Sequence, residues 1–299
     1  MKKKILALVL CIAILAVAIA GGTMAYFTDN DADVNTFVVG NVEIKQNEEQ
    51  REYVIDNTTG RHDYNDDKVV AFENDHPLVP AVIPGDTHSY DGTITLGNGN
   101  TYNIWDETIN NELDKFITVT NTGSEEAYIR TIIAFEDDAA GSLTTKLHTL
   151  WGGDEDGKYE ELTIKPDANG EYVGMESGKA IYWLQNADGS WLTLNIGGTT
   201  YTVAVFTYKD YLEADETSDP SLMQLWLDPS ATNEWSEAVG DQYQIIAASL
   251  AVQADGFNDP DIADPASKAM DTAFDLTEAN LITWLTATNK TTGTANTVS

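Results

Sequence analysis

Short runs of alternating apolar and polar residues, each bounded by turn residues, are the feature that most limits the folds open to this chain. They are clearest in Phe116–Phe135, where FITVT and AYIRTIIAF flank the tetrapeptide Asn121-Thr122-Gly123-Ser124. Alternation with a period of two places the apolar side chains on one face of a strand, and Asn-Thr-Gly-Ser is typical of a turn. This stretch therefore predicts two strands joined in a hairpin.

Four more runs of the same kind follow, separated by Asp-Gly and Gly-Gly turns. Tyr243–Ala254 is too uniformly apolar to assign by its period, but its Ile and Val content and the following Gly256 favour a long buried strand. Many short strands with polar turns predict a mainly all-β chain folded as a jelly-roll β-sandwich. The four runs are Tyr159–Ile164, Tyr182–Gln185, Trp191–Ile196 and Thr200–Tyr208.

Helical signals are few, and the regions between the main strands are acidic. Asp219 as a cap and Pro220 at the first position predict a short helix over Pro220–Leu227, and a second helix is expected over Asp275–Ala287. Residues 141–228 are acidic and turn-rich, which predicts a locally paired, β-rich insertion within a jelly-roll domain spanning 38–288. Residues 289–299 have no apolar face and are predicted to be a disordered tail.

The N-terminus has the three parts of a secretory signal peptide. Lys2, Lys3 and Lys4 precede an apolar run from Ile5 to Ala20, which is shorter than the roughly 20 apolar residues of a membrane span. Thr23-Met24-Ala25 then offers a small-x-small cleavage site. We predict that residues 1–25 are removed by cleavage between Ala25 and Tyr26, and an uncleaved N-terminal anchor is the alternative.

Removal of this segment changes both the charge and the cysteine content. The remaining chain has 13 basic residues against 49 acidic ones, a formal charge of −36 compared with −33 for the whole sequence. A surface this acidic repels nucleic acid and anionic lipid. The single cysteine, Cys11, is lost with the signal peptide, so the mature chain cannot form an internal disulfide.

Catalytic motifs are missing from the sequence. The four histidines never form H-E-x-x-H, and neither a G-x-S-x-G elbow nor a phosphate-binding loop occurs. Asp29–Asp33 and Asp154–Gly157 begin like calcium loops but do not continue with the required spacing. The seven tryptophans are scattered, which favours core packing over a binding platform. The sequence thus predicts no catalytic residue, cofactor or specific metal site, and only weak Ca²⁺ binding by the acidic surface.

Several segments together resemble the TasA/camelysin family of exported biofilm-matrix and spore-coat-associated proteins. The most specific is the N-terminal block, in which Gly21–Ala25 is followed by Tyr26-Phe27-Thr28-Asp29, then Asn35-Thr36-Phe37 and Gly40–Ile44. Three later pieces fit in order: Ile83–Asp86, Val119–Ser124 and Ala251–Phe257. The resemblance covers both ends and the middle of the chain but not the 141–228 region.

This resemblance implies processing by a signal peptidase of the SipW type, a jelly-roll domain and assembly into extracellular fibres. In fibre-forming relatives, the freed N-terminal segment adds a strand to the sheet of the next subunit. Camelysin is classed as a metalloprotease, but the present sequence lacks a zinc-protease motif that would carry this activity over.

Residues 26–37 have the composition expected of such a donor strand. Their large apolar residues are Tyr26, Phe27, Val34 and Phe37, too few for the segment to fold by itself. Pairing with an open sheet edge would satisfy that edge's backbone groups and bury these side chains. Because a head-to-tail contact does not close on itself, it propagates as a filament.

We therefore expect a secreted, non-enzymatic structural protein that polymerises into biofilm-matrix fibres or coats the cell or spore surface. Its expected partners are further copies of itself, the SipW-type peptidase and other matrix proteins. Two alternatives remain open. One is a monomeric secreted adhesin or calcium-dependent binding module, and the other is a camelysin-like metallopeptidase.

Overall fold

The computed structural model describes residues 28–31, 42–55, 62–73, 92–106, 112–138, 146–151, 160–163, 181–184, 186, 190–231, 243–257 and 264–287. In these parts the chain is mostly antiparallel β-structure with two helices, which confirms the predicted mainly-β sandwich. Neither described helix is long and apolar enough to cross a membrane.

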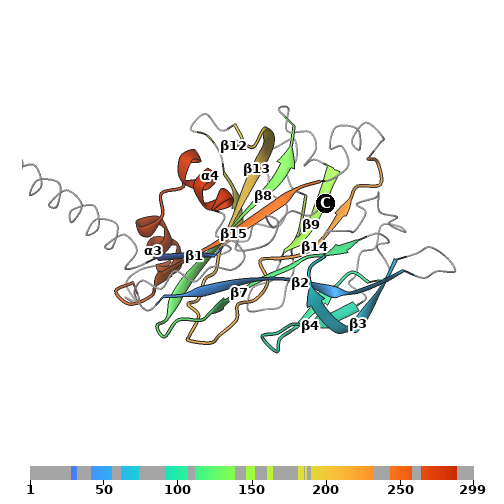
Figure 1. The fold of residues 1–299 in the computed structure, drawn as a ribbon, viewed down its shortest axis with the longest axis horizontal. Helices are drawn as coiled ribbons and strands as arrows, with labels where there is room; N and C mark the ends of the chain where they lie inside the picture. Colours follow the sequence, from blue (N-terminus) through green and yellow to red (C-terminus); the bar gives the residue numbers. More distant parts are fainter. Residues whose placement is uncertain are drawn as a thin grey trace, which may run out of the picture.

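One layer of the sandwich is a six-stranded antiparallel sheet, the main sheet. Strands β8 and β15 lie side by side in this sheet, and β1 lies at one edge (Figure 1). The order is β1 (Thr28–Asp31), β15 (Ile245–Gln253), β8 (Ala127–Asp137), β13 (Thr199–Thr207) and β11 (Ile181–Trp183), with β12 (Thr193–Ile196) also paired to β13.

The second layer is built from two smaller sheets that meet along one line. The chain before and within β14 runs beside β6 and β7, with backbone bonds from Lys115 N to Met223 O and from Ser221 N to Ile117 O, each 2.8 Å. The two sheets therefore form one continuous layer. Their orders are β3 (His62–Ala71), β2 (Ile44–Ile55), β7 (Phe116–Asn121) and β10 (Glu160–Thr163), β9 (Leu147–Trp151), β14 (Leu222–Leu227), β6 (Leu113–Asp114).

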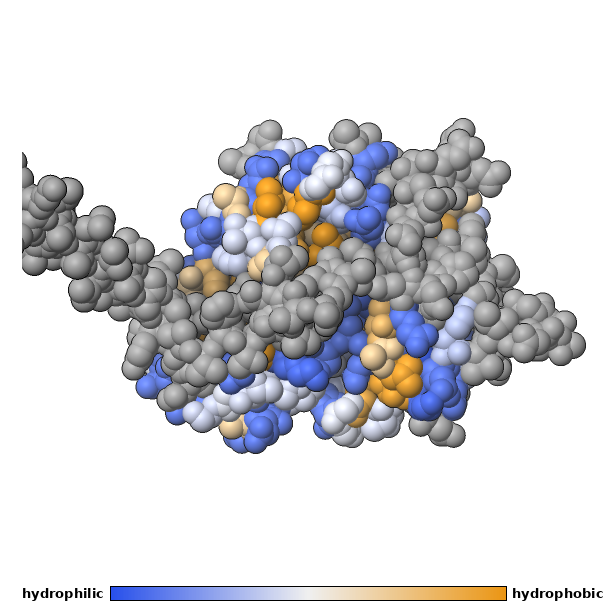
Figure 2. Space-filling view, in the orientation of Figure 1, coloured by the Kyte–Doolittle hydropathy of each residue, from blue (hydrophilic) through white to orange (hydrophobic). Residues whose placement is uncertain are grey.

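The apolar core lies between these layers and continues on both outer sides. Alternate residues of β8 point in opposite directions, so that Ile133 packs against the second layer while Ile132 packs toward the helices. Helices α3 (Pro265–Ala273) and α4 (Glu278–Thr286) cover the outer face of the main sheet. A hairpin of β4 (Gly92–Thr95) and β5 (Thr101–Ile104) packs on the outer face of the second layer. The described part of the surface in Figure 2 is largely hydrophilic, with apolar residues in small separate areas.

The strands predicted from alternation are confirmed, but the hairpin predicted for 116–135 is wrong. β7 pairs with β2 in the second layer, whereas β8 pairs with β13 and β15 in the main sheet. The buried Asn121 explains the difference. Its Nδ2 donates to the carbonyls of Glu125 (2.8 Å) and Leu212 (3.0 Å), and its Oδ1 accepts from Gly123 N (3.0 Å). These bonds stabilise a corner that carries the chain between layers.

The helix predicted over Pro220–Leu227 is also wrong, since Leu222–Leu227 forms strand β14. Every residue of β14 is buried, because Leu225 faces the core between the layers and Met223 faces the β4–β5 hairpin. A strand buried on both faces has no alternating pattern, so its sequence can resemble a short helix.

The predicted helix near the C-terminus is confirmed as α4, and α3 is an additional helix, capped by Asp264 with Pro265 at its start. The local pairing predicted for 141–228 is found, since β9 pairs with β10 and β14 and β13 pairs with β11 and β12, but the region also joins the main sheet. β13, which belongs to this region, pairs with β8 from Thr200 to Thr207 within the main sheet. The predicted tail at 289–299 lies outside the described residues.

Candidate functional site

β1 occupies the edge of the main sheet and pairs there with its own chain. Thr28 is opposite Val252 and Asp31 is opposite Ser249 in an antiparallel register. The other side of β15 pairs with β8 from Ile245 to Gln253. β1 therefore covers the side of β15 that β8 leaves open, and it does so with the segment predicted to be a donor strand.

The strand that accepts β1 is fixed on both of its faces. Leu250 and Val252 pack toward the helices, while Ala247 and Ala251 pack between the layers. Ser249 Oγ donates to Gln46 Oε1 at 2.7 Å, which links β15 to β2. The accepting edge consequently belongs to the rigid body of the sandwich.

Backbone bonds at the two ends of β15 show which residues face β1. Ala254 N donates to Glu126 O (2.8 Å), and Glu136 N donates to Gln244 O (2.9 Å), so the even-numbered positions face β8. In an antiparallel strand, consecutive residues direct their N–H and C=O groups to opposite sides. Ala251 therefore directs its backbone N–H toward β1.

None of the five predicted site residues falls within the part of the chain that the structure describes. Ala25 and Tyr26 at the predicted cleavage site, and Phe27, Val34 and Phe37 as predicted anchors, lie outside the described residues. Their roles stay predictions. The described part of segment 26–37 is a strand, as expected for a donor segment, and its partner in the structure is its own β15.

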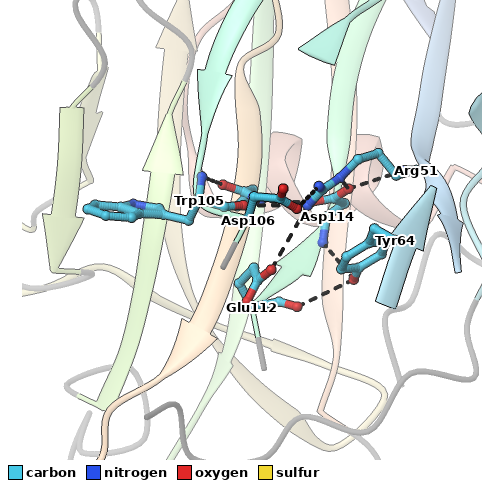
Figure 3. A network of polar contacts seen from close by, with 7 residues as sticks. Arg51, Tyr64, Trp105, Asp106, Glu112 and Asp114 are labelled. Atoms are coloured by element: carbon cyan, nitrogen blue, oxygen red, sulfur yellow. Dashed lines mark hydrogen bonds and ion pairs between the residues drawn. The ribbon is translucent and has the colours of Figure 1, made fainter. Parts of the chain in front are cut away.

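A second candidate site is a set of charged and polar groups, most of them buried, which we call the Arg51 network (Figure 3). Arg51 of β2 is fully buried and donates from Nε to Asp114 Oδ2 at 2.6 Å and from Nη2 to Asp114 Oδ1 at 3.2 Å. Its Nη1 forms an ion pair with Asp106, and its guanidinium lies 4.4 Å from the centre of the Tyr64 ring. Both carboxylates therefore share one arginine.

Polar contacts extend this network across five segments. Gln224 of β14 donates from Nε2 to Asp114 Oδ1 and to Trp105 O, each at 2.8 Å. The Tyr64 hydroxyl of β3 donates to Glu112 O and accepts from Asp114 N, each at 3.3 Å. The network therefore joins β2, β3, the end of β5, β6 and β14.

Glu112 is the third carboxyl group of the Arg51 network. Its side chain is 5% exposed, and its closest approach to Arg51 is 4.0 Å, from Oε1 to Nη2. Burial raises the pKa of Glu112 to about 9, and the charges of Asp114 and Asp106 act in the same direction. The group is therefore neutral at pH 7. The sequence does not indicate this network, because its members are scattered among ordinary polar positions.

The structure gives no metal centre for the peptidase alternative within the residues it describes. His148 of β9 bonds through Nε2 to Asp228 Oδ2 at 2.9 Å and stacks on Trp226 with ring centres 5.6 Å apart. Burial would raise the pKa of Asp228, but hydrogen bonds from Ser230 and His148 outweigh it and lower the pKa to about 2. No group of three or more His, Cys, Asp or Glu side chains in the described ranges could hold a metal ion.

Comparison with known families finds one match, to the camelysin metallo-endopeptidase family, over residues 1–59. The match supports the resemblance to the TasA/camelysin family in this part of the chain, which includes β1 and β2. No curated protein and no solved structure matches the chain.

Proposed function

We propose that this chain is a secreted structural protein that polymerises head to tail by donating its N-terminal segment to the main sheet of another copy. The observation that supports this most directly is the pairing of β1 with the edge of β15. In the proposed polymer, the same edge accepts β1 of a neighbouring subunit. The match to the camelysin metallo-endopeptidase family includes this segment.

The exchange follows from the energetics of strand swapping. A donated β1 would make the same backbone bonds to β15 as the chain's own β1, so that exchange replaces contacts with equivalent ones. The rest of β15 is already packed and paired with β8, so the accepting sheet does not depend on β1 for its core. Since each subunit then has one donor and one acceptor, the contact repeats as a filament.

This proposal also includes how the donor becomes available and where the polymer forms. Cleavage between Ala25 and Tyr26 by a SipW-type signal peptidase would free the segment from the apolar N-terminus. The exported copies would then form biofilm-matrix fibres or a coat on the cell or spore surface, where other matrix proteins are the further partners.

Two complementary variants test the mechanism. Deletion of residues 26–35 removes the donor, and Ala251→Pro removes the backbone N–H that faces β1 while leaving the groups that face β8. We expect neither variant to form fibres alone. A mixture should give one-to-one dimers, because one variant retains the donor and the other retains the acceptor. Size-exclusion chromatography with negative-stain microscopy measures this outcome.

Ala251→Ser is the matched control, since it retains the backbone N–H and should still form fibres. Circular dichroism of each variant establishes that the sandwich is folded. Fibres formed by the donor deletion would contradict strand donation. A mature wild-type chain that stays monomeric at every concentration would instead support the adhesin or binding-module alternative.

The name of the matched family provides the second candidate function, that of a metallo-endopeptidase. A peptide-cleavage assay on the mature chain, with and without a chelator, distinguishes it from the structural role. Chelator-sensitive cleavage that is retained by the fibre-deficient variants would favour the peptidase.

A further inference from the structure

The Arg51 network has more acidic groups than its single cation can neutralise. The carboxylate of Asp114 accepts hydrogen bonds from Arg51 N, Nε and Nη2 at 3.2, 2.6 and 3.2 Å, and another from Gln224 Nε2 at 2.8 Å. Asp106 takes the remaining face of the guanidinium through Nη1. Because the guanidinium already bonds these two carboxylates, Glu112 Oε1 lies farther away, at 4.0 Å from Arg51 Nη2.

The groups around Glu112 come from four elements, and burial together with the two nearby acids favours its neutral form over the opposing effects of Arg51 and its own backbone N–H. Arg51 of β2 is the cation, Tyr64 of β3 is neutral, and Asp106 after β5 and Asp114 of β6 are the two acids. A charged Glu112 would add a third carboxylate to a site with one positive charge. Because a buried charge that is only partly neutralised is costly, the side chain retains its proton instead.

We propose that protonated Glu112 acts as a pH-sensitive clamp that holds β3 and the β4–β5 hairpin against the β6–β14 pair. Glu112 directly precedes β6, and its carbonyl accepts the hydrogen bond of Tyr64 from β3. Loss of the proton would draw the side chain toward water and displace this carbonyl. The contacts of the adjoining Asp114 with Arg51 and Gln224 would then weaken together. This inference is independent of strand donation.

The direction of the pH effect follows from proton linkage. Burial raises the pKa of Glu112 from 4.5 to about 9 in the closed structure, so the closed form binds one more proton than the open form between these values. The stabilisation is fully present below pH 4.5 and is lost progressively as the pH rises toward 9. For one proton, the equilibrium constant for opening increases about tenfold per pH unit.

Hydrogen exchange of the β4–β5 amides measures this opening. After correction for the intrinsic effect of pH on exchange, the wild-type opening constant should rise about tenfold per unit between pH 6 and pH 8. Glu112→Gln keeps the shape of the side chain without its titration, so this dependence should disappear. Glu52→Gln is the matched control, because Glu52 lies at the surface beside Lys68 and its loss should leave the slope unchanged.

Direct titration of Glu112 in the wild-type chain tests whether its side chain holds a proton at neutral pH, even if Glu112→Gln does not fold. Carbon NMR of the Glu112 carboxyl group should show a titration midpoint near 9. A midpoint at the ordinary glutamate value of about 4.3 would overturn the proposal. So would a folded Glu112→Gln variant with the same pH slope as the wild type.

Discussion

At the scale of single residues, the most unusual feature is the fully buried Arg51 in a chain with few basic residues. Arg51→Met should lower the free energy of unfolding by about 3 to 5 kcal/mol, because it leaves the buried Asp114 carboxylate without its cation. Lys68→Met is the control. Its ion pair with Glu52 is exposed, and such pairs contribute little to stability because water screens them. Urea unfolding measures both, and equal losses would show that the Arg51 network contributes little.

Burial of single residues is predictable from the sequence for large aromatic side chains but not for Arg51. Trp105 and Trp226 were correctly predicted to belong to the core, because large scattered aromatics are usually buried. Arg51 stands in the polar stretch QNEEQREY, and its partner Asp114 lies 63 residues further along the chain. Local patterns contain no information about a pairing at that separation. The Arg51 network therefore became visible only in the structure.

At the scale of secondary-structure elements, the sequence predicts where strands lie more reliably than which strands pair with one another. The strands at 116–135 were found, but the Asn121 corner sends them to different layers. Alternation reports which residues of a strand are buried, whereas pairing depends on side-chain bonds such as that from Asn121 to Leu212, 91 residues away. β14 was missed for a related reason, since burial on both faces removes the alternation.

The Asn121 corner can be tested by one substitution. Asn121→Ala removes two donated bonds and one accepted bond within a buried site, leaving the carbonyls of Glu125 and Leu212 without this donor. We expect the free energy of unfolding to fall by about 2 to 3 kcal/mol. Asn47→Ala, which loses bonds to Thr118 and Thr120 at a half-buried site, should cost less. Thermal and urea unfolding compare the two, and an equal cost would assign no special role to the corner.

At the scale of the whole molecule, the large excess of acidic over basic residues governs how subunits approach one another. Arg51, Lys115 and Arg130 are each at most 1% exposed, and each is paired with a carboxylate. Each of these charges is neutralised by its partner, so the formal net charge of −33 comes from the excess of 49 acidic over 16 basic residues in the whole sequence. Approaching subunits consequently repel one another over a distance set by the ionic strength.

This repulsion predicts how assembly should respond to solution conditions. If the chain polymerises as proposed, growth of fibres from mature protein should accelerate with added salt, with divalent cations, and as the pH falls toward the carboxylate pKa values, because each reduces the repulsion between subunits. Light scattering with microscopy measures the rate, and an uncharged osmolyte at equal osmolality controls for non-specific effects. Glu112→Gln should retain this response, since the effect belongs to the whole surface and not to the buried clamp. Fastest growth at neutral pH and low salt would mean that attraction between unlike patches governs association instead.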